Sequence, residues 1–147
     1  MKKLFVVMTI VGLLALSLAA SAQAQMPGVP IRASIPFDFM VRGRTLPAGN
    51  YEIERVTEDP SGLVLRNVNN KHEHIVFETE PMQGKRIPGH NVLVFNRYGD
   101  EYFLSEVVTA GDQTGRELAP SHAERTLRRE MMAQNQAEAE TVTVALY

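Results

Sequence analysis

The chain has 147 residues, with 15 basic and 17 acidic side chains, a net charge of −2 and no cysteine. A chain without thiols has no disulfide, cysteine nucleophile, cysteine-zinc site, haem attachment or iron–sulfur cluster. A mildly acidic surface of mixed charge also argues against a general nucleic-acid binder, so we expect no nucleic-acid partner.

The first 24 residues have the pattern of a secretory signal peptide. Lysines at positions 2 and 3 precede an apolar run over residues 4–20, and alanines at 22 and 24 are the small residues that a signal peptidase reads. We expect cleavage after Ala24, with the Ala-Ser-Ala run at 20–22 as an alternative site. The protein is therefore predicted to be exported, to the periplasm or to the medium. No later apolar run approaches the ~20 residues of a spanning helix, so no transmembrane span is expected after cleavage.

The remaining 123 residues are enough for one domain. The signal segment holds two of the 15 basic residues and none of the 17 acidic ones, which leaves 13 against 17 and a net charge of −4. A chain of this length buries roughly two-thirds of its unfolded surface, so it can fold without a metal or a disulfide. We interpret residues 25–30 as an N-terminal tether and 31–147 as a single β-rich domain.

Short β-like runs separated by turn residues extend from residue 31 to about 108, at the spacing of an antiparallel all-β domain. The predicted strands cover 31–35, 37–41, 51–56, 63–68, 72–80, 91–97 and 101–108. The run 91–97 is apolar on both faces, which is typical of a central strand. Tyr98-Gly99-Asp100 predicts a tight hairpin into the next strand.

The C-terminal part is predicted to form a helix and a closing strand. Ser121 and Glu124 have the spacing of a capping box, in which each side chain satisfies a free N–H at the helix start. Helix formers continue to about 139, with a thin apolar stripe at Ala123, Leu127 and Met131, so this amphipathic helix should lie on a surface. Residues 141–147 alternate and are expected to form the last strand. The prediction is one antiparallel β-sandwich or partly open barrel of seven or eight strands.

The sharpest candidate site is His72-Glu73-His74 followed by Glu78. Residues of equal parity share one face of a strand, so His72, His74 and Glu78 are predicted to lie on the same side. Two imidazoles and a carboxylate are suitable ligands for one divalent transition metal, such as zinc, manganese or iron.

The spacing resembles the first metal motif of the cupins, His-x-His-x-x-x-Glu. Cupins are β-barrel proteins, and the resemblance implies a further histidine ligand, for which His90 is the candidate. The motif of that family has a glycine where this chain has Arg66. The competing interpretation is that Ile75 and Phe77 form the core face, which would place both histidines on the polar outer face.

Two further patterns, paired glutamates on strands and a row of arginines on the helix, can be interpreted either as functional sites or as ordinary solvent-exposed surface. The pairs Glu52/Glu54 and Glu78/Glu80 have the arrangement of acid–base carboxylates, but same-face acids are more typical of a solvated strand edge. Arg125, Arg128 and Arg129 give the helix a basic side that could contact an anionic membrane or a partner groove. We favour the surface interpretation for both patterns.

Several short segments of the chain also resemble a known protein family. They are Ile35-Pro36-Phe37-Asp38-Phe39, Leu46-Pro47-Ala48-Gly49-Asn50-Tyr51, the run 97–104 and the run 115–118. Together they resemble a family of small exported bacterial proteins with an IPFDF…LPAGxY signature and no assigned activity. The resemblance implies export and a β fold, and it supplies no chemistry.

We therefore expect an exported, non-enzymatic binding or structural module of the cell envelope. Its partner would be a protein, a glycan or a small ligand. The alternative is a cupin-like metalloprotein that uses His72, His74, Glu78 and His90.

Overall fold

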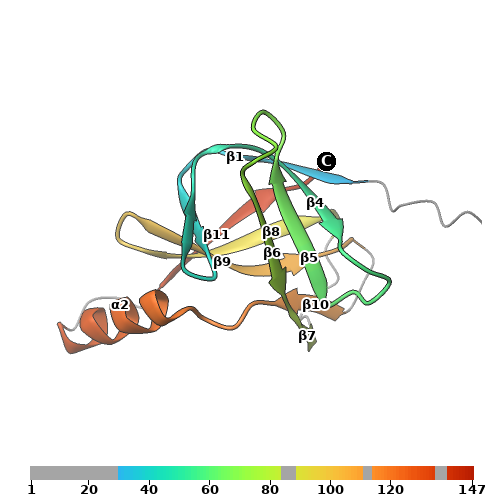
Figure 1. Ribbon diagram of the computed structural model, residues 1–147. Helices are drawn as coiled ribbons and strands as arrows, with labels where there is room; N and C mark the ends of the chain where they lie inside the picture. Colours follow the sequence, from blue (N-terminus) through green and yellow to red (C-terminus); the bar gives the residue numbers. More distant parts are fainter. Residues whose placement is uncertain (1–29, 84–88, 111–113, 135–138) are drawn as a thin grey trace, which may run out of the picture.

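The computed structural model describes residues 30–83, 89–110, 114–134 and 139–147. The predicted signal peptide, 1–24, and the tether up to residue 29 lie outside these described residues. The described part is mainly β, with two sheets and one helix, and this confirms the predicted antiparallel β-sandwich with a C-terminal helix (Figure 1).

The first sheet, sheet A, contains four antiparallel strands in the order β1-β4-β5-β6. Their bounds are β1 Ile31–Ile35, β4 Gly49–Arg55, β5 Gly62–Asn67 and β6 His74–Glu78. Side chains alternate between the two faces of a strand. In β4, Tyr51 and Ile53 are therefore buried while Glu52 and Glu54 face outward, as the alternation in the sequence predicts.

The second sheet, sheet B, follows the path β11-β8-β9-β10-β7. Its bounds are β7 Glu80–Gln83, β8 Val92–Tyr98, β9 Glu101–Val108, β10 Thr114–Glu117 and β11 Glu140–Ala145. Strand β8 lies between β11 and β9, which confirms the predicted central strand. The predicted hairpin is also present, because Tyr98 pairs with Glu101 and Gly99 has a φ of +63°. A positive φ at this position is typical of a type II′ turn.

A short hairpin branches from sheet B. It consists of β2, Phe39–Val41, and β3, Arg44–Leu46, and Met40 of β2 pairs with Phe103 of β9. Because β8 occupies one side of β9, both β2 and β10 lie on the other side. Sheet B therefore divides into two arms beyond β9, one formed by β2–β3 and the other by β10–β7.

The two sheets are connected at two corners. At one corner Ala33 of β1 bridges to Leu146, which follows β11, and Arg32 and Tyr147 exchange two backbone hydrogen bonds of 3.0 Å. At the other corner the chain passes from β6 in sheet A to β7 in sheet B through Thr79. The side chains between the sheets are thus enclosed on several sides.

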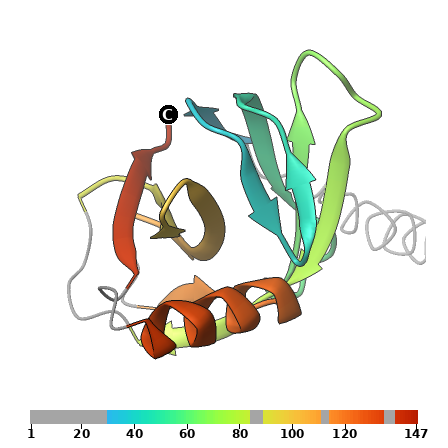
Figure 2. The same cartoon turned by 90° about the vertical axis from the view of Figure 1, so that its left-hand side faces the viewer.

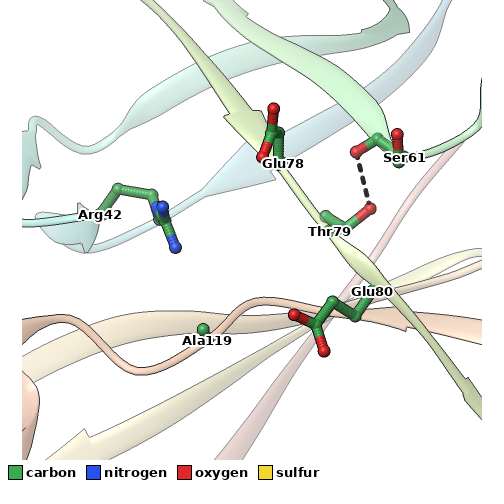
Figure 3. Close-up of a pocket in the computed structure, with 6 residues that line it drawn as sticks. All are labelled: Arg42, Ser61, Glu78, Thr79, Glu80 and Ala119. Atoms are coloured by element: carbon green, nitrogen blue, oxygen red, sulfur yellow. Dashed lines mark hydrogen bonds between the residues drawn. The ribbon is translucent and has the colours of Figure 1, made fainter.

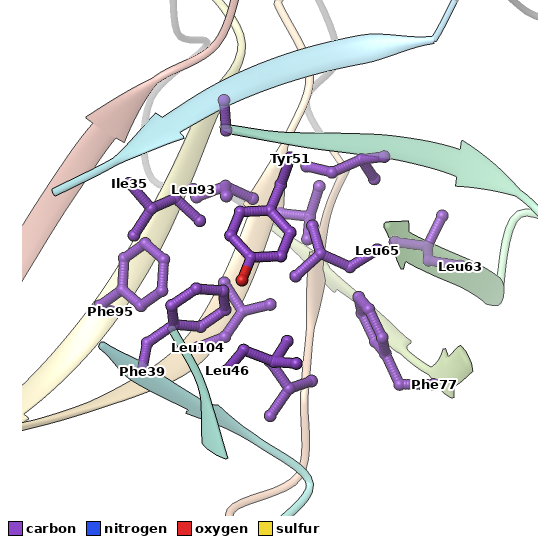
Figure 4. Packing of buried hydrophobic residues seen from close by; sticks show 14 of the residues in the cluster. Ile35, Phe39, Leu46, Tyr51, Leu63, Leu65, Phe77, Leu93, Phe95 and Leu104 are labelled. Atoms are coloured by element: carbon purple, nitrogen blue, oxygen red, sulfur yellow. The ribbon is translucent and has the colours of Figure 1, made fainter. Parts of the chain in front are cut away.

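Aromatic rings fill the centre of the sandwich (Figure 4). The Phe39 ring makes edge-to-face contacts with Tyr51 and Phe95, at centroid distances of 5.3 and 5.5 Å. The Tyr51 hydroxyl donates to the Pro47 carbonyl oxygen at 2.7 Å, so this buried polar group is satisfied. Burial of such large apolar side chains contributes about 1.5–3 kcal/mol each. The Leu-Pro-Ala-Gly turn noted in the sequence thus holds the central tyrosine of the core.

Helix α2, His122–Ala133, lies in the lower part of the molecule in Figures 1 and 2. The Ser121 hydroxyl accepts the Glu124 N–H at 3.2 Å, which confirms this half of the predicted capping box. The Glu124 carboxylate is buried and accepts hydrogen bonds from Asn96 Nδ2 at 3.0 Å and the Tyr98 hydroxyl at 3.4 Å. This carboxylate therefore docks the start of the helix on β8 rather than completing a reciprocal cap.

The rest of the helix lies on the surface, as expected. Leu127 and Met131 are half-buried, whereas Ala123 of the predicted stripe is exposed. The helix ends at Ala133, earlier than the predicted 139. The chain must return so that Glu140 of β11 can pair with Arg97 of β8, and a longer helix would carry it away from that strand.

The described residues form eleven strands, more than the seven or eight expected. The predicted strand 72–80 begins at His74 and divides at Thr79 into β6 and β7. Strands β3 and β10 are not among the predicted strands. These two strands have three and four residues, too few for the alternation to stand out from a loop. None of the helices in the described ranges is long and apolar enough to cross a membrane.

Candidate functional site

The two predicted histidine ligands are exposed, His74 on the outer face of sheet A and His72 in the turn before β6. Ile75 is half-buried and Phe77 is buried against the core, and this puts His74 on the opposite side of the strand. The cross-strand partner of His74 is Arg66, so a fixed positive charge lies beside that imidazole. A neighbouring guanidinium opposes the approach of a metal cation.

Glu78 and His90 do not complete a metal site around these histidines. Glu78 is exposed at the end of β6 opposite Gly62, and His90 is exposed just before β8 in the other sheet. On a regular strand, four residues separate His74 from Glu78 by about 13 Å. No group of three or more histidine, aspartate or glutamate side chains in the described ranges could hold a metal ion. The structure thus places two of the four, His74 and Glu78, on sheet A and the other two outside the strands, without bringing them together.

A cavity of about 190 Å³ lies where sheet B divides into its two arms (Figure 3). Its lining comes from four separate segments, namely the tip of the β2–β3 hairpin, the turn before β5, the β6–β7 crossing and the segment after β10. The lining residues are Arg42, Ser61, Glu78, Thr79, Glu80 and Ala119. One guanidinium therefore shares the cavity wall with two carboxylates.

Thr79 fixes the crossing that carries both carboxylates. It is buried, and its N–H and its hydroxyl each donate to the Ser61 carbonyl oxygen at 2.9 Å. Arg116 Nε then donates to the Thr79 hydroxyl oxygen at 3.1 Å. Because Glu78 and Glu80 flank this anchored residue, the positions of their backbones are set by hydrogen bonds rather than by a free loop.

The tip of the β2–β3 hairpin carries Arg42 into the cavity wall in an uncommon backbone conformation. Arg42 has a φ of +53° and Gly43 a φ of +85°. Two consecutive positive φ values are required by the type I′ turn that joins two strands through two residues. Arginine rarely adopts this region, so the turn holds Arg42 in a conformation that glycine or asparagine would adopt at lower cost.

Glu80 is also the first member of a row of three glutamates across sheet B. Glu80 of β7 pairs with Glu117 of β10, and Glu117 pairs in turn with Glu106 of β9. Residues directly opposite in a sheet project their side chains from the same face. We call Glu80, Glu117 and Glu106 the glutamate row.

The position of Glu106, the most buried glutamate of the row, changes its ionisation. Burial raises the pKa of the half-buried Glu106 carboxyl, and the negative charge of Glu117 raises it further. Like charges directly opposite each other destabilise a sheet. The opposition of Glu106 and Glu117 therefore costs folding free energy at neutral pH.

The pair Glu78/Glu80 stands out in the sequence, whereas Glu106 and Glu117 do not. The other pair that it named, Glu52/Glu54, lies on sheet A, where Glu52 forms an ion pair of 2.8 Å with Arg32. The strand register alone brings the glutamate row together, and no local spacing in the sequence signals it. Comparison with protein-family models, curated proteins and solved structures finds no match to this chain.

Proposed function

We propose that this protein is an exported, non-enzymatic binding module of the cell envelope. Export rests on the pattern of the first 24 residues and on the resemblance to small exported proteins. The proposed ligand presents a cationic group to the glutamate row and the adjoining cavity.

The observation that carries this proposal is the alignment of three carboxylates on adjacent strands beside a small cavity. A cation placed against them relieves their mutual repulsion, and its attraction grows where the site is partly desolvated. The single guanidinium of Arg42 on the cavity wall gives a contact for an oxygen atom of the same ligand. Such a site selects a polar ligand that carries positive charge, for example a lysine side chain of a partner protein.

The test is a titration of the purified protein with n-butylammonium, which has the same charged end as a lysine side chain. Binding is monitored by the NMR chemical shifts of the backbone amides. The uncharged analogue n-butanol is the ligand control. We expect saturable shifts near Thr79, Glu106 and Glu117 with n-butylammonium alone, with a dissociation constant on the order of 1 mM for so small a ligand.

Two variants make the titration specific. Glu117→Gln removes the central charge of the row. The loss of one charge contact should reduce the binding free energy by about 1.4 kcal/mol, which corresponds to a tenfold higher dissociation constant. Glu54→Gln removes a half-buried glutamate that faces Val64 on sheet A, and it should bind as the unaltered protein does. Equal binding by the two variants would contradict the proposal.

A further inference from the structure

Strand β6 presents an open edge of sheet A. Among the described strands it pairs only with β5. Backbone hydrogen bonds from Asn67 to Glu73 and from Thr79 to Ser61 show that the odd-numbered residues of this segment bond to β5. In an antiparallel ladder the N–H and C=O groups of alternate residues point to opposite sides. The backbone groups of His74, Val76 and Glu78 therefore point to the open edge.

The side chains of the same three residues are exposed on the outer face. Val76 is 58% exposed, which makes it one of the most exposed large apolar side chains among the described residues. Its cross-strand partner is another valine, Val64. An edge strand with an exposed apolar centre is a template for pairing with another strand.

The order of residues along β6 makes this edge complementary to itself. If a second β6 lies antiparallel with Val76 opposite Val76, then His74 of each strand lies opposite Glu78 of the other. Residues 74, 76 and 78 all direct their backbone groups to the open edge, so every such pair can exchange two hydrogen bonds. On the inner face the same register places Ile75 opposite Phe77. An imidazole N–H of His74 can donate to the facing Glu78 carboxylate, and apolar cross-strand pairs stabilise a sheet.

We propose that two copies of this chain associate through their β6 edges, about a two-fold axis at Val76. The result is one continuous sheet that runs through the four strands of sheet A in each copy. An isologous contact of this kind closes on itself and leaves no further β6 edge open. The contact does not use the glutamate row, which lies on sheet B, but Glu78 belongs both to this contact and to the wall of the cavity beside the row.

Arg44 of the β2–β3 hairpin in the same chain already occupies one acceptor of this edge. Its Nη1 donates to the His74 carbonyl oxygen at 3.1 Å, across from the β2–β3 hairpin. In the dimer the Glu78 N–H of the other copy replaces this exposed guanidinium contact. An exposed side-chain hydrogen bond contributes little, so its exchange does not oppose pairing strongly.

The absence of cysteine from the chain permits a direct test. Val76→Cys introduces a single thiol at the two-fold axis, where facing Cα atoms of a hydrogen-bonded pair lie about 5.5 Å apart, within the roughly 4.4–6.8 Å that a disulfide spans. Under mild oxidation we expect this variant to form covalent dimers about tenfold faster than Val56→Cys, because pairing raises the local thiol concentration. Val56 is a matched control, since it is a valine that is 48% exposed but lies just after β4, away from the β6 edge. Equal rates for the two variants would overturn the proposal.

Charge exchange in the Val76→Cys background tests the register. His74→Glu places two carboxylates opposite each other, and Glu78→Lys removes the carboxylate that accepts from His74, so either change alone should slow dimer formation severalfold. The double variant His74→Glu/Glu78→Lys pairs glutamate with lysine and should restore the rate. All of these positions are exposed, and unchanged thermal unfolding of each variant shows that folding is intact. A double variant as slow as the single ones would refute this register and with it the proposed contact.

Discussion

Replacing Glu106 by glutamine should stabilise the protein at neutral pH. The glutamine keeps the shape of the side chain and removes its repulsion with Glu117, its cross-strand partner. Cross-strand pair effects are roughly 0.2–1 kcal/mol, so we expect a gain of about 0.5 kcal/mol in the free energy of unfolding. For a domain of this size the gain corresponds to an increase of about 2 °C in Tm.

The gain should depend on pH with a definite sign. The folded-state pKa of Glu106 is raised, by burial first and by Glu117 second. A carboxyl with a raised folded pKa contributes stability below its unfolded pKa, about 4.3, and loses this contribution as pH rises through the folded pKa. The advantage of Glu106→Gln should thus be full at pH 7 and vanish below about pH 4.

The assay is urea unfolding followed by circular dichroism at several pH values. Glu54→Gln is the control, because Glu54 faces Val64 rather than another acid, and its stability should show no comparable gain. The double variant Glu106→Gln/Glu117→Gln should gain less than the sum of the single variants, since either change removes the same repulsion. A loss of stability in Glu106→Gln at pH 7, or a gain that persists at pH 3.5, would refute the reasoning.

Two further predictions concern the helix and the histidines. Ser121→Ala removes the acceptor for the Glu124 N–H and should cost about 1 kcal/mol of unfolding free energy by urea denaturation. A Ser121→Asp variant, which restores an acceptor, should recover most of that loss, and no difference between the two variants would contradict the role of the cap. Elemental analysis of the purified, untagged protein should find no stoichiometric transition metal, because His72, His74 and His90 are exposed and do not converge. Near-stoichiometric metal that disappears in His72→Ala/His74→Ala would instead establish the cupin-like alternative.

Features encoded by a few adjacent residues could be predicted from the sequence. The Gly99-Asp100 hairpin needs only a glycine that tolerates positive φ, and the helix start needs only the hydroxyl of Ser121 before the helical run. The outward orientation of His74 followed from the apolar alternation of Ile75 and Phe77. In each case the local residues and the final structure favour the same conformation.

Features that depend on tertiary pairing could not be predicted in the same way. The β2–β3 turn was missed because Arg42 has a positive φ, which its residue type does not suggest. Strand β10 contains Gly115, a residue type that is uncommon in strands, and it is defined by its partners β7 and β9. The glutamate row depends on the register of three strands that are distant in the sequence.

The most direct test of the glutamate row as a binding site measures two quantities on the same variant, Glu106→Gln. One is the free energy of unfolding at pH 7, and the other is the affinity for n-butylammonium from the NMR titration. A site that is kept at a cost to stability should give a variant that is more stable and binds severalfold more weakly. A variant that is more stable and binds with unchanged affinity would show that the row is only a strained part of the surface, and it would contradict the proposed function.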